Sequence, residues 1–331
     1  MINSSPSSRQ PLRESWPRER LEHERAIALG QSIDSTTWSN YSSALNSYLD
    51  FVKKHNFPVD PTPDTLSFYT VYMSHYIKPS SVDTYLSGIC QQLEPFFPEV
   101  RKNRKSVLVH RTIAGCKRIK AIPTTRKRAL TIDDLCLVLN NHGTTPNHDD
   151  LLFHAQLTIG FFALLRLGEL TYPDNHNLQN PQKTTKRTSV EISATSFQFF
   201  LPGHKADRFF EGNSIVLLKN NSSSIPVFQK FNNYLISRDK LFPYSSPLWL
   251  MSNGEIPTRS FFIRRLRHFF DADISGHSLR AGGATWLALT NTPPSIIQAA
   301  GRWSSDSFQI YIRKNPILVH ALMQTPLSQT I

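Results

Sequence analysis

His277, Arg280 and Tyr311 are the residues of this chain whose types and spacing could do chemistry on a phosphate. His277 and Arg280 are three positions apart, so in a helix both side chains would project from one face and could reach the same anionic oxygen. A tyrosine one element further along could attack the phosphorus beside that oxygen. A His-x-x-Arg pair also arises by chance in chains of this length, so the hypothesis depends on the elements that position these side chains.

The charge of the chain indicates a polyanionic partner. Its 331 residues carry a formal net charge of +12 and are 39% hydrophobic, enough for a buried core and, at this length, for two domains. A basic surface favours nucleic acid or an acidic membrane. The membrane is the weaker expectation, because the longest apolar stretch, around Leu157 to Leu165, is about half of what a spanning helix requires. No secretory signal is visible from Met1 to Arg20, so we expect an intracellular protein, nuclear if the host is eukaryotic.

The cysteines and histidines favour neither a disulfide framework nor a metal site. The cysteines, which are far apart and odd in number, are Cys90, Cys116 and Cys136. Three histidines also lie near one another in the sequence, His142, His148 and His154. Their spacing does not align metal ligands on one helix face. We expect these histidines to be solvated or to cap helices. No metal, no cofactor and no small-molecule substrate are predicted.

The first part of the chain is expected to be helical after a flexible arm. Residues 1–30 are charged and low in complexity, with some helix from Arg18 onward. Residues 31–122 predict a small helical bundle. Ser35 is expected to cap the first helix, and Thr62 with Pro63 to open the second. Ser80 and Asp83 are expected to form a start like a capping box for the third, and a fourth helix is expected near Val107 to Ile119.

The strongest charge bias lies between residues 101 and 128, where eleven Lys or Arg residues occur without any Asp or Glu. They are Arg101, Lys102, Arg104, Lys105, Arg111, Lys117, Arg118, Lys120, Arg126, Lys127 and Arg128. A solvated helix face normally mixes both signs, so a run of one sign is better explained by contacts with phosphates. Residues 31–122 are therefore interpreted as a DNA-binding domain. A nuclear-localisation signal in Arg126-Lys127-Arg128 is compatible with this interpretation.

Residues 123–331 predict a second domain, mainly helical with a small β-hairpin or sheet, so the expected fold class is α+β. Thr131 and Asp134 would start its first helix. The next helix, from Asp149 to Leu165, has an acidic start that is interpreted as capping. It is apolar nearly all round, which predicts the central buried helix of the domain.

Two cationic residues follow at positions where a positive charge is not explained by local structure alone. Arg166 comes directly after the buried helix, where a guanidinium is costly unless an anion or a partner such as Glu169 compensates it. The ion pair alone could be its whole role. Alternating apolar residues at 190–201 and 215–218 predict strands, and Lys205 lies between them in the expected turn. A lone lysine in a hairpin is usually only solvated.

In this order and spacing, these residues resemble the tyrosine recombinase (phage integrase) family. The matching positions are Arg166-x-x-Glu169, Lys205 on a β-hairpin, His277-x-x-Arg280 and Tyr311. Each motif is weak, but together, over residues 31 to about 325, they form a strong joint signal. The segment from Gly301 to Tyr311 also resembles recombinases of DIRS-like and related eukaryotic mobile elements, in which Gly-Arg-Trp precedes the tyrosine segment.

The resemblance implies a core-binding bundle and a catalytic domain that form a C-shaped clamp on double-stranded DNA, with a homo-tetramer assembling on the DNA. It implies cutting and rejoining without metal or ATP. Tyr311 would form a 3′-phosphotyrosyl link, while Arg166 and Arg280 stabilise the negative charge on the phosphate. His277 would take the tyrosine proton or contact the phosphate, and Lys205 would protonate the leaving 5′-oxygen.

One position departs from the family pattern. The family usually has His or Trp, after a Gly, nine residues before the nucleophile; here Arg302 has that spacing and Trp303 is one residue closer. Trp303 is favoured, because an indole N–H can donate to a phosphate oxygen and the ring can pack behind the site. Arg302 would instead supply a third cation. Glu169 is expected to orient Arg166 or His277.

Two other functions remain open on the same residues. A domesticated or inactive recombinase would bind DNA without cutting it. A type IB topoisomerase would use the same chemistry to relax supercoils without a partner site.

Overall fold

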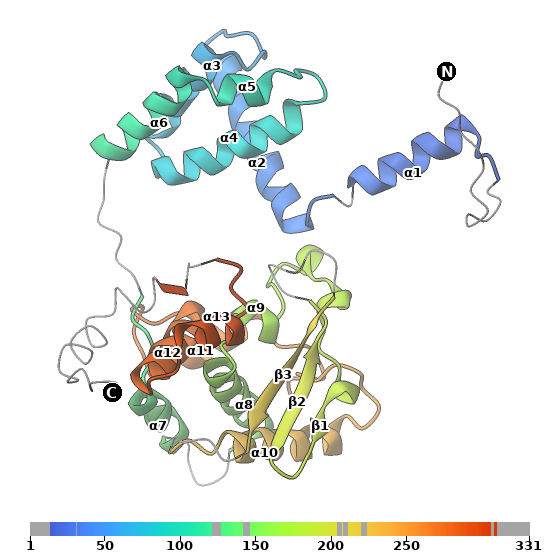
Figure 1. The fold of residues 1–331 in the computed structure, drawn as a ribbon, viewed down its shortest axis with the longest axis vertical. Helices are drawn as coiled ribbons and strands as arrows, with labels where there is room; N and C mark the ends of the chain where they lie inside the picture. The colour runs from blue at the N-terminus through green and yellow to red at the C-terminus, as the bar shows by residue number, and fades with distance from the viewer. Residues whose placement is uncertain are drawn as a thin grey trace, which may run out of the picture. The chain divides into compact units, whose positions relative to one another are not determined.

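The structure is a computed structural model, and it describes residues 14–30, 32–120, 127–141, 146–203, 207, 211–219, 224–305 and 308–309. The chain divides into two compact units, Met1–Thr124 and Thr125–Ile331, each with its own hydrophobic core (Figure 1). Most of the described chain is helical, and a small antiparallel sheet lies in the second unit, which confirms the expected fold class. The C-shaped clamp concerns the arrangement of the two units and stays a prediction.

The first unit is built from helices alone in its described part. They are α1 (Arg18–Gly30), α2 (Ser35–Lys54), α3 (Pro63–Met73), α4 (Pro79–Leu93), α5 (Val100–Arg104) and α6 (Val107–Ile119). Helix α2 packs on α4 and α3 packs on α6, around an aromatic core in which the Tyr48 and Tyr69 rings meet edge to face at 5.6 Å. Burial raises the pKa of Tyr69 to about 12, so this phenol is a neutral core residue. None of the residues of α1 is buried.

The starts of α2, α3 and α6 have side-chain caps, although not always from the expected residue. Thr62 caps α3 as predicted, and its hydroxyl accepts from the Thr65 N–H at 3.2 Å. Ser35 was expected to cap α2, but the cap is Asp34, which accepts from the Thr36 N–H at 3.0 Å. A carboxylate is favoured at this end because the helix dipole is positive there.

The expected capping box at the start of α4 is wrong. The helix begins at Pro79, and no side chain caps it. Asp83 instead uses its carboxylate at longer range, accepting from Lys117 at 2.8 Å and from Arg104 at 3.2 Å. A proline at the first helical position has no N–H to satisfy, which reduces the need for a cap.

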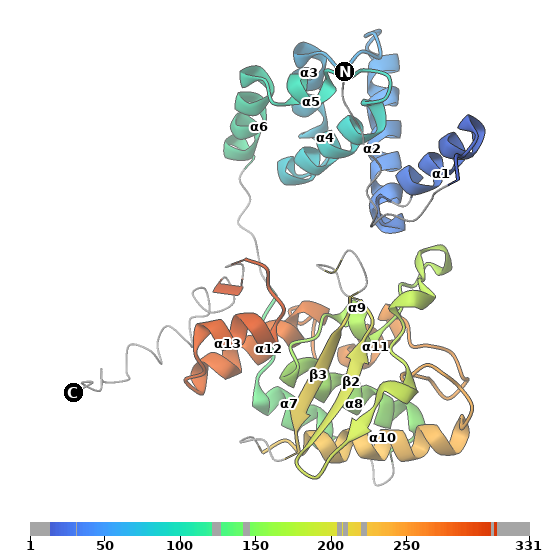
Figure 2. The same ribbon diagram turned by 45° about the vertical axis from the view of Figure 1, so that its right-hand side comes forward.

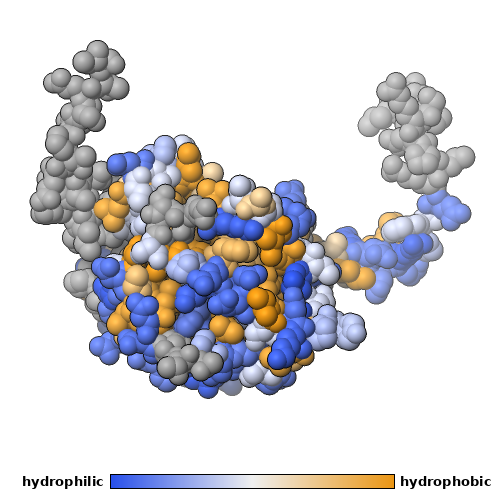
Figure 3. All heavy atoms as spheres, turned by 90° about the horizontal axis from the view of Figure 1, so that it is seen from below, coloured by the Kyte–Doolittle hydropathy of each residue, from blue (hydrophilic) through white to orange (hydrophobic). Residues whose placement is uncertain are grey.

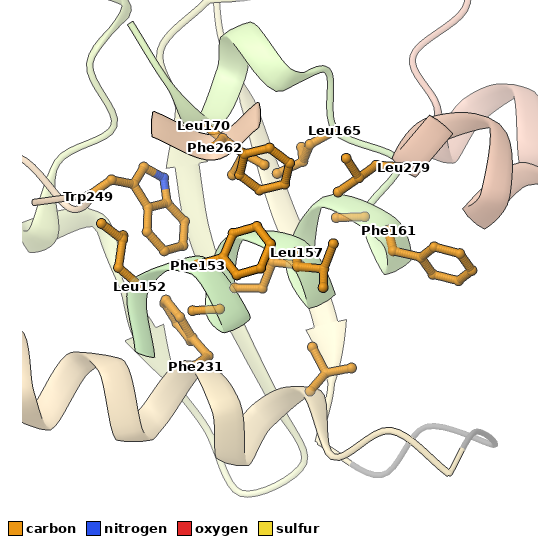
Figure 4. Close-up of a cluster of buried hydrophobic side chains, with 14 of the residues drawn as sticks. Leu152, Phe153, Leu157, Phe161, Leu165, Leu170, Phe231, Trp249, Phe262 and Leu279 are labelled. Atoms are coloured by element: carbon orange, nitrogen blue, oxygen red, sulfur yellow. The ribbon is translucent and has the colours of Figure 1, made fainter. Parts of the chain in front are cut away.

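The second unit surrounds one buried helix. Its helices and short 3₁₀ turns are α7 (Ile132–Asn140), α8 (His148–Phe162), α9 (Leu167–Leu170), η1 (His176–Leu178), η2 (Pro181–Lys183), η3 (Arg187–Ser189), α10 (Val227–Leu241), α11 (Arg259–Arg267), α12 (Gly276–Leu289) and α13 (Pro294–Ala300). Helix α8 is buried along most of its length, as its apolar sequence predicted, and α10 and α12 pack on it (Figure 2). Phe153, Leu157 and Phe161 of α8 lie at the centre of the core, with Leu279 of α12 pointing toward them (Figure 4).

The sheet has the order β1-β2-β3, with strands β1 (Glu191–Ile192), β2 (Ser196–Leu201) and β3 (Asn213–Leu218), all antiparallel. Alternate residues of β2 are buried, and the Phe197 ring stacks on Phe231 of α10 at 5.2 Å. The predicted alternation is therefore confirmed. Lys205 falls between β2 and β3, as expected for a hairpin, but it lies outside the described residues.

Two of the three histidines that were expected to be solvated or capping are buried, so that expectation is wrong for them. His148 binds through its ring to Ser237 Oγ at 2.9 Å and to the Leu250 carbonyl at 3.0 Å. His154 is only 2% exposed. Both lie on α8, where His148 is buried in the first turn and every residue from Leu152 to Phe161 is buried, polar residues included. His142 lies outside the described residues.

The surface mixes hydrophilic and hydrophobic residues. On the face shown in Figure 3, hydrophobic side chains are interrupted by hydrophilic ones. Across the residues that the structure describes, no helix combines the length and the apolar character needed to cross a membrane.

Candidate active site

Arg280 connects the C-terminal ends of two helices. Arg280 is 2% exposed, and its Nη1 donates to the carbonyl of Leu164, just beyond the end of α8, at 2.8 Å. Nη2 donates to the carbonyl of Gly301, at the end of α13. A rigid planar guanidinium can hold two acceptors at fixed directions, which an ammonium cannot. Arg280 therefore fixes the distance between two segments that lie far apart in the sequence.

Both of these helix ends have the same unusual backbone. Leu164 and Arg302 have φ values of 53° and 54°, in the left-handed region. The turn after α13 closes through Arg302 N–H to Ala299 O at 2.9 Å and Trp303 N–H to Gln298 O at 3.1 Å, the hydrogen bonds of a Schellman motif. Glycine usually occupies the left-handed position, and a residue with a Cβ there costs about 1–3 kcal/mol. The fold accepts this strain at both ends.

Glycines in α12 let this helix approach the end of α8 closely. A Cβ on Gly283 would lie 2.0 Å from the carbonyl oxygen of Phe161, and a Cβ on Gly282 would lie 2.3 Å from that of Leu130. No side chain fits at either position without moving backbone. The short separation brings Arg280, on the preceding turn of α12, within reach of the Leu164 carbonyl.

Glu169 is shared by two arginines. Its carboxylate accepts from Arg166 Nη1 at 3.0 Å through Oε1, and from Arg302 Nη2 at 3.0 Å through Oε2. Oε2 also accepts from the Arg166 backbone N–H at 3.0 Å. The Glu169 side chain is 4% exposed, Arg302 10% and Arg166 23%, so the carboxylate is enclosed while Arg166 keeps access to solvent. The expectation that Glu169 orients Arg166 stays a prediction, and this geometry is consistent with it.

Trp303 lies against Arg280. The guanidinium carbon is 4.1 Å from the centre of the indole, a cation–π contact, and the ring also lies 5.9 Å from Phe308. A Cβ on Gly301 would come within 1.7 Å of the same ring. The glycine before Arg302 is therefore required so that the indole can fold back over the turn.

The cluster is suited to binding an anion. Its described members contribute three guanidinium groups, from Arg166, Arg280 and Arg302, against the single carboxylate of Glu169. Burial lowers the pKa of Arg302, and the carboxylate of Glu169 opposes that effect. The ordinary pKa of an arginine lies far above neutral pH, so its guanidinium remains charged. Preorganised guanidinium groups of this kind can stabilise the charge that develops on a phosphate during transfer.

The structure places the predicted residues unequally. His277 lies in the first turn of α12 and is exposed, while Arg280, one turn later, is buried. The structure brings together Arg166, Glu169, Arg280, Arg302 and Trp303. Lys205, Arg126 and Tyr311 lie outside the described residues, so their positions relative to the cluster stay predictions.

The basic residues of the first unit are partly neutralised by carboxylates from other elements. Arg101 pairs with Glu94 at 2.6 Å and Lys102 with Glu99 at 2.8 Å, in addition to the pairs that Asp83 makes. Hydrogen bonds from Lys117, followed by those from Arg104, lower the pKa of Asp83.

Further basic residues differ in their surroundings. Arg128 pairs with Asp134 at 2.6 Å, and Lys127 donates to the Ala272 carbonyl at 2.6 Å. Within the described chain, no carboxylate forms an ion pair with Lys105, Arg111, Arg118 or Lys120. These four are therefore the best-placed candidates for direct contacts with phosphates.

Sequence reasoning missed the residues that shape the site without contacting an anion. Gly282 and Gly283 carry a visible signal, since two glycines inside a helix indicate close approach of another backbone. Leu164 carries none, because its left-handed conformation depends on the buried contacts around it. Among the described residues, no group of three or more His, Cys, Asp or Glu side chains is placed to hold a metal ion.

Comparisons with known proteins give matches in structure and none in sequence. No family model and no curated protein matches the chain. XerH site-specific recombinase, bound to a palindromic difH substrate in a post-cleavage complex, has a TM-score of 0.59 at 12% identity and covers 86% of this chain and 78% of its own. A lambda integrase tetramer bound to a Holliday junction has a TM-score of 0.54 at 13% identity and covers 88% of this chain and 76% of its own. The Tn1549 transposon integrase, in complex with circular intermediate DNA, has a TM-score of 0.52 at 13% identity and covers 85% of this chain and 99% of its own. The chain thus has the fold of the tyrosine recombinases.

Proposed function

We propose that this chain is a site-specific DNA recombinase that cuts and rejoins double-stranded DNA through a 3′-phosphotyrosyl intermediate. The observation that carries the proposal is the buried cluster in which Arg166 and Arg302 share Glu169 while Arg280 joins the two helix ends beside them. Three guanidinium groups held in this way form a site for a single phosphate. The shared fold supports the same function.

In the proposed reaction, the hydroxyl oxygen of Tyr311 attacks the phosphorus of the scissile phosphate. A phosphotyrosyl bond forms and the bond from phosphorus to the 5′-oxygen breaks. The tyrosine proton passes to His277 or to solvent, and Lys205 gives a proton to the departing 5′-oxygen. Attack by a 5′-hydroxyl on the phosphotyrosine reverses these steps and joins the strands. No ATP and no metal ion are needed, because the phosphodiester bond energy is conserved in the protein link.

Arg166 and Arg280 would stabilise the negative charge that builds up on the non-bridging oxygens in this reaction. Arg280 is fixed by carbonyls of the protein, so it is preorganised before DNA arrives. Arg166 is held by Glu169 on one side and remains partly exposed. This combination of a rigid and an accessible guanidinium fits the clamping of a substrate that enters from solvent.

We propose double-stranded DNA as the partner of the first unit, with contacts from the basic residues of α5 and α6. The lambda integrase match is a tetramer on a Holliday junction, and we propose the same assembly for this chain on two DNA sites. In a eukaryotic host we propose that the protein acts in the nucleus, as part of a mobile element.

The test is to trap the covalent intermediate on DNA. A library of duplexes with randomised sequence carries a nick near the centre, so that a short 5′-hydroxyl fragment diffuses away after cleavage and rejoining is prevented. We expect a protein–DNA adduct that resists denaturant, forms equally well in EDTA and disappears in Tyr311→Phe. Sequencing the attached DNA would give the target site.

Three results would contradict the proposal. An adduct that persists in Tyr311→Phe would show that Tyr311 is not the nucleophile. DNA binding without any adduct would indicate a DNA-binding protein that has lost its activity. Relaxation of supercoiled plasmid by the protein, without a partner site, would indicate a topoisomerase.

A further inference from the structure

We propose that Arg302, and not the indole of Trp303, contacts the scissile phosphate as a third guanidinium. This inference rests on the proposed function, because it assigns a role within the same reaction. In the sequence, either Arg302 or Trp303 could fill the family position before the nucleophile. The structure gives these two residues different surroundings.

The backbone of Arg302 is the first argument. Its φ of 54° places an arginine where glycine or asparagine is the usual residue. Three other helix ends in the described part of the chain have the same backbone: two carry asparagine, Asn56 and Asn291, and the third carries Leu164, whose side chain is buried in the core. An arginine is therefore not needed to make the turn. Its side chain must contribute something that offsets the strain.

The donors of the Arg302 guanidinium are the second argument. Nη2 binds Glu169 at 3.0 Å and Nη1 is 3.3 Å from the Ala300 carbonyl. Nε is buried and has no hydrogen-bond partner in the structure. A buried donor without an acceptor is unfavourable, and a charged one more so. An oxygen of a bound phosphate would satisfy it.

The position of the Trp303 ring is the third argument. The indole covers the Arg280 guanidinium at 4.1 Å and contacts Phe308, in a small core cluster that also contains Leu164 and Ile297. An aromatic face against a guanidinium both holds it and excludes water from it. Trp303 is therefore a positioning residue, which acts on the substrate through Arg280.

Charge explains why a third guanidinium is useful here. Glu169 compensates part of the charge of Arg166, and a single carboxylate paired with a single arginine would attract a phosphate only weakly. Arg302 binds the other oxygen of the same carboxylate. With Arg302 present, Glu169 can orient Arg166 without cancelling the positive charge of the site.

The experiment uses the full-length protein and the trapped adduct, with Arg302→Gly as the main variant. Glycine adopts the left-handed backbone without strain, which offsets part of the stability lost with the Glu169 ion pair, so we expect this variant to fold with a Tm modestly below that of wild type. We expect adduct formation to fall on the order of a hundredfold, as for loss of one donor to a developing oxyanion. Asn291→Gly makes the same backbone change away from the cluster and should leave adduct formation unchanged.

A second substrate separates contact with the phosphate from a structural effect. A methylphosphonate at the scissile position replaces one charged oxygen by a methyl group, so less positive charge is needed to bind it. We expect it to restore much of the activity of Arg302→Gly relative to wild type, because a missing cation matters less there. Trp303→Phe keeps an aromatic face for Arg280 and lacks the indole N–H, so its adduct formation should fall much less than that of Arg302→Gly.

Distinct outcomes separate this inference from the proposed function. If wild type forms an adduct and Arg302→Gly forms it at the same rate, the inference is wrong and the proposed function stands. If Arg302→Gly is impaired equally on both substrates, Arg302 does not contact the phosphate. If Trp303→Phe loses a hundredfold while Arg302→Gly does not, the indole has the role. An absent adduct in wild type overturns both proposals.

Discussion

The arginines of the second unit and the basic residues of α5 and α6 meet carboxylates in two different ways. Around Glu169 the carboxylate and Arg302 are nearly enclosed, whereas Arg166 keeps some access to solvent. Backbone carbonyls at strained helix ends hold the neighbouring Arg280. Around Asp83 the side chains are 30% to 44% exposed, and each could exchange its partner for another anion. Under the proposed function, this difference distinguishes a site that acts on one phosphate from a surface that contacts several.

The largest contrast is expected for arginine-to-lysine changes, which keep the charge and lose the planar donor pair. Arg280→Lys cannot hold the Leu164 and Gly301 carbonyls together, so we expect adduct formation to fall by on the order of a hundredfold or more. Arg101→Lys, on the exposed surface, should change it by less than about twofold. Similar losses of adduct formation in both variants would show that the two regions do not differ in how strictly they require arginine.

A methyl group added to a glycine should have opposite effects in the two units. In Gly283→Ala the new Cβ meets a backbone oxygen, so we expect a destabilisation of about 1–3 kcal/mol and a loss of adduct formation. Gly115 of α6 has no atom within 4 Å of such a Cβ. Gly115→Ala should therefore stabilise the protein by about 0.5–1 kcal/mol, since glycine weakens a helix interior.

Denaturant unfolding of both variants checks this prediction. A Gly283→Ala protein as stable as wild type would show that α12 can move away from α8 without cost. In that case Arg280 would not depend on the close packing of the two helices.

Neutralising the buried carboxylate should separate DNA binding from cleavage. Glu169→Gln leaves Arg166 and Arg302 without their shared anion, and we expect a destabilisation of about 1.5–3 kcal/mol, typical of a lost hydrogen bond to a charged group. Adduct formation should fall more than about tenfold because Arg166 is no longer held. The affinity for DNA, measured by fluorescence anisotropy, should not fall, since the variant is more positive. A parallel loss of affinity and cleavage would contradict the positioning role.

Neutralising the exposed carboxylate should have the smallest effect on stability and a favourable effect on binding. Asp83→Asn releases Lys117 and Arg104 for phosphates, so DNA affinity should rise a few-fold at low salt, with a salt dependence steeper by about one to two phosphate contacts. The lost pair should change stability by less than about 1 kcal/mol.

The pH dependence of this effect follows from the Asp83 carboxylate. Because Lys117 and Arg104 lower the pKa of Asp83, it is charged in wild type throughout the neutral range, and any stability that it contributes is lost only in acid, as the pH falls through that lowered pKa. The affinity difference should therefore be constant between about pH 6 and pH 8. A difference that varies across this range would assign the effect to another group.

Features encoded within a few neighbouring residues could be predicted from the sequence. Helix α6 has the bounds that were expected, and Thr131 caps α7 with Asp134 as its partner in a capping box. Both depend on apolar periodicity and on side chains that bind the backbone nearby. The short helix α5 was missed, because a single turn leaves almost no periodicity to detect.

Contacts between distant residues could not be predicted in this way. The run of cations from 101 to 128 has one sign in the sequence, yet Asp83 and Glu94 lie beside it in the folded chain. Spacing could not decide between Arg302 and Trp303 either. Both belong to the cluster, but the left-handed backbone at Arg302 directs their side chains to different partners. Arg302 binds Glu169, and Trp303 packs on Arg280.

The sharing of Glu169 by Arg166 and Arg302 also has a consequence for a chain that is still being made. A ribosome adds residues from the N-terminus, so the segment with α8 and α9 emerges long before the turn after α13. Until that turn arrives, Arg166 and Glu169 can only neutralise each other, and Arg280 lacks the Gly301 carbonyl. An unfinished chain would therefore have its helical first unit before the arginine cluster is assembled. If the proposed function holds, folding of the turn after α13 would be the step that completes the centre for strand cleavage.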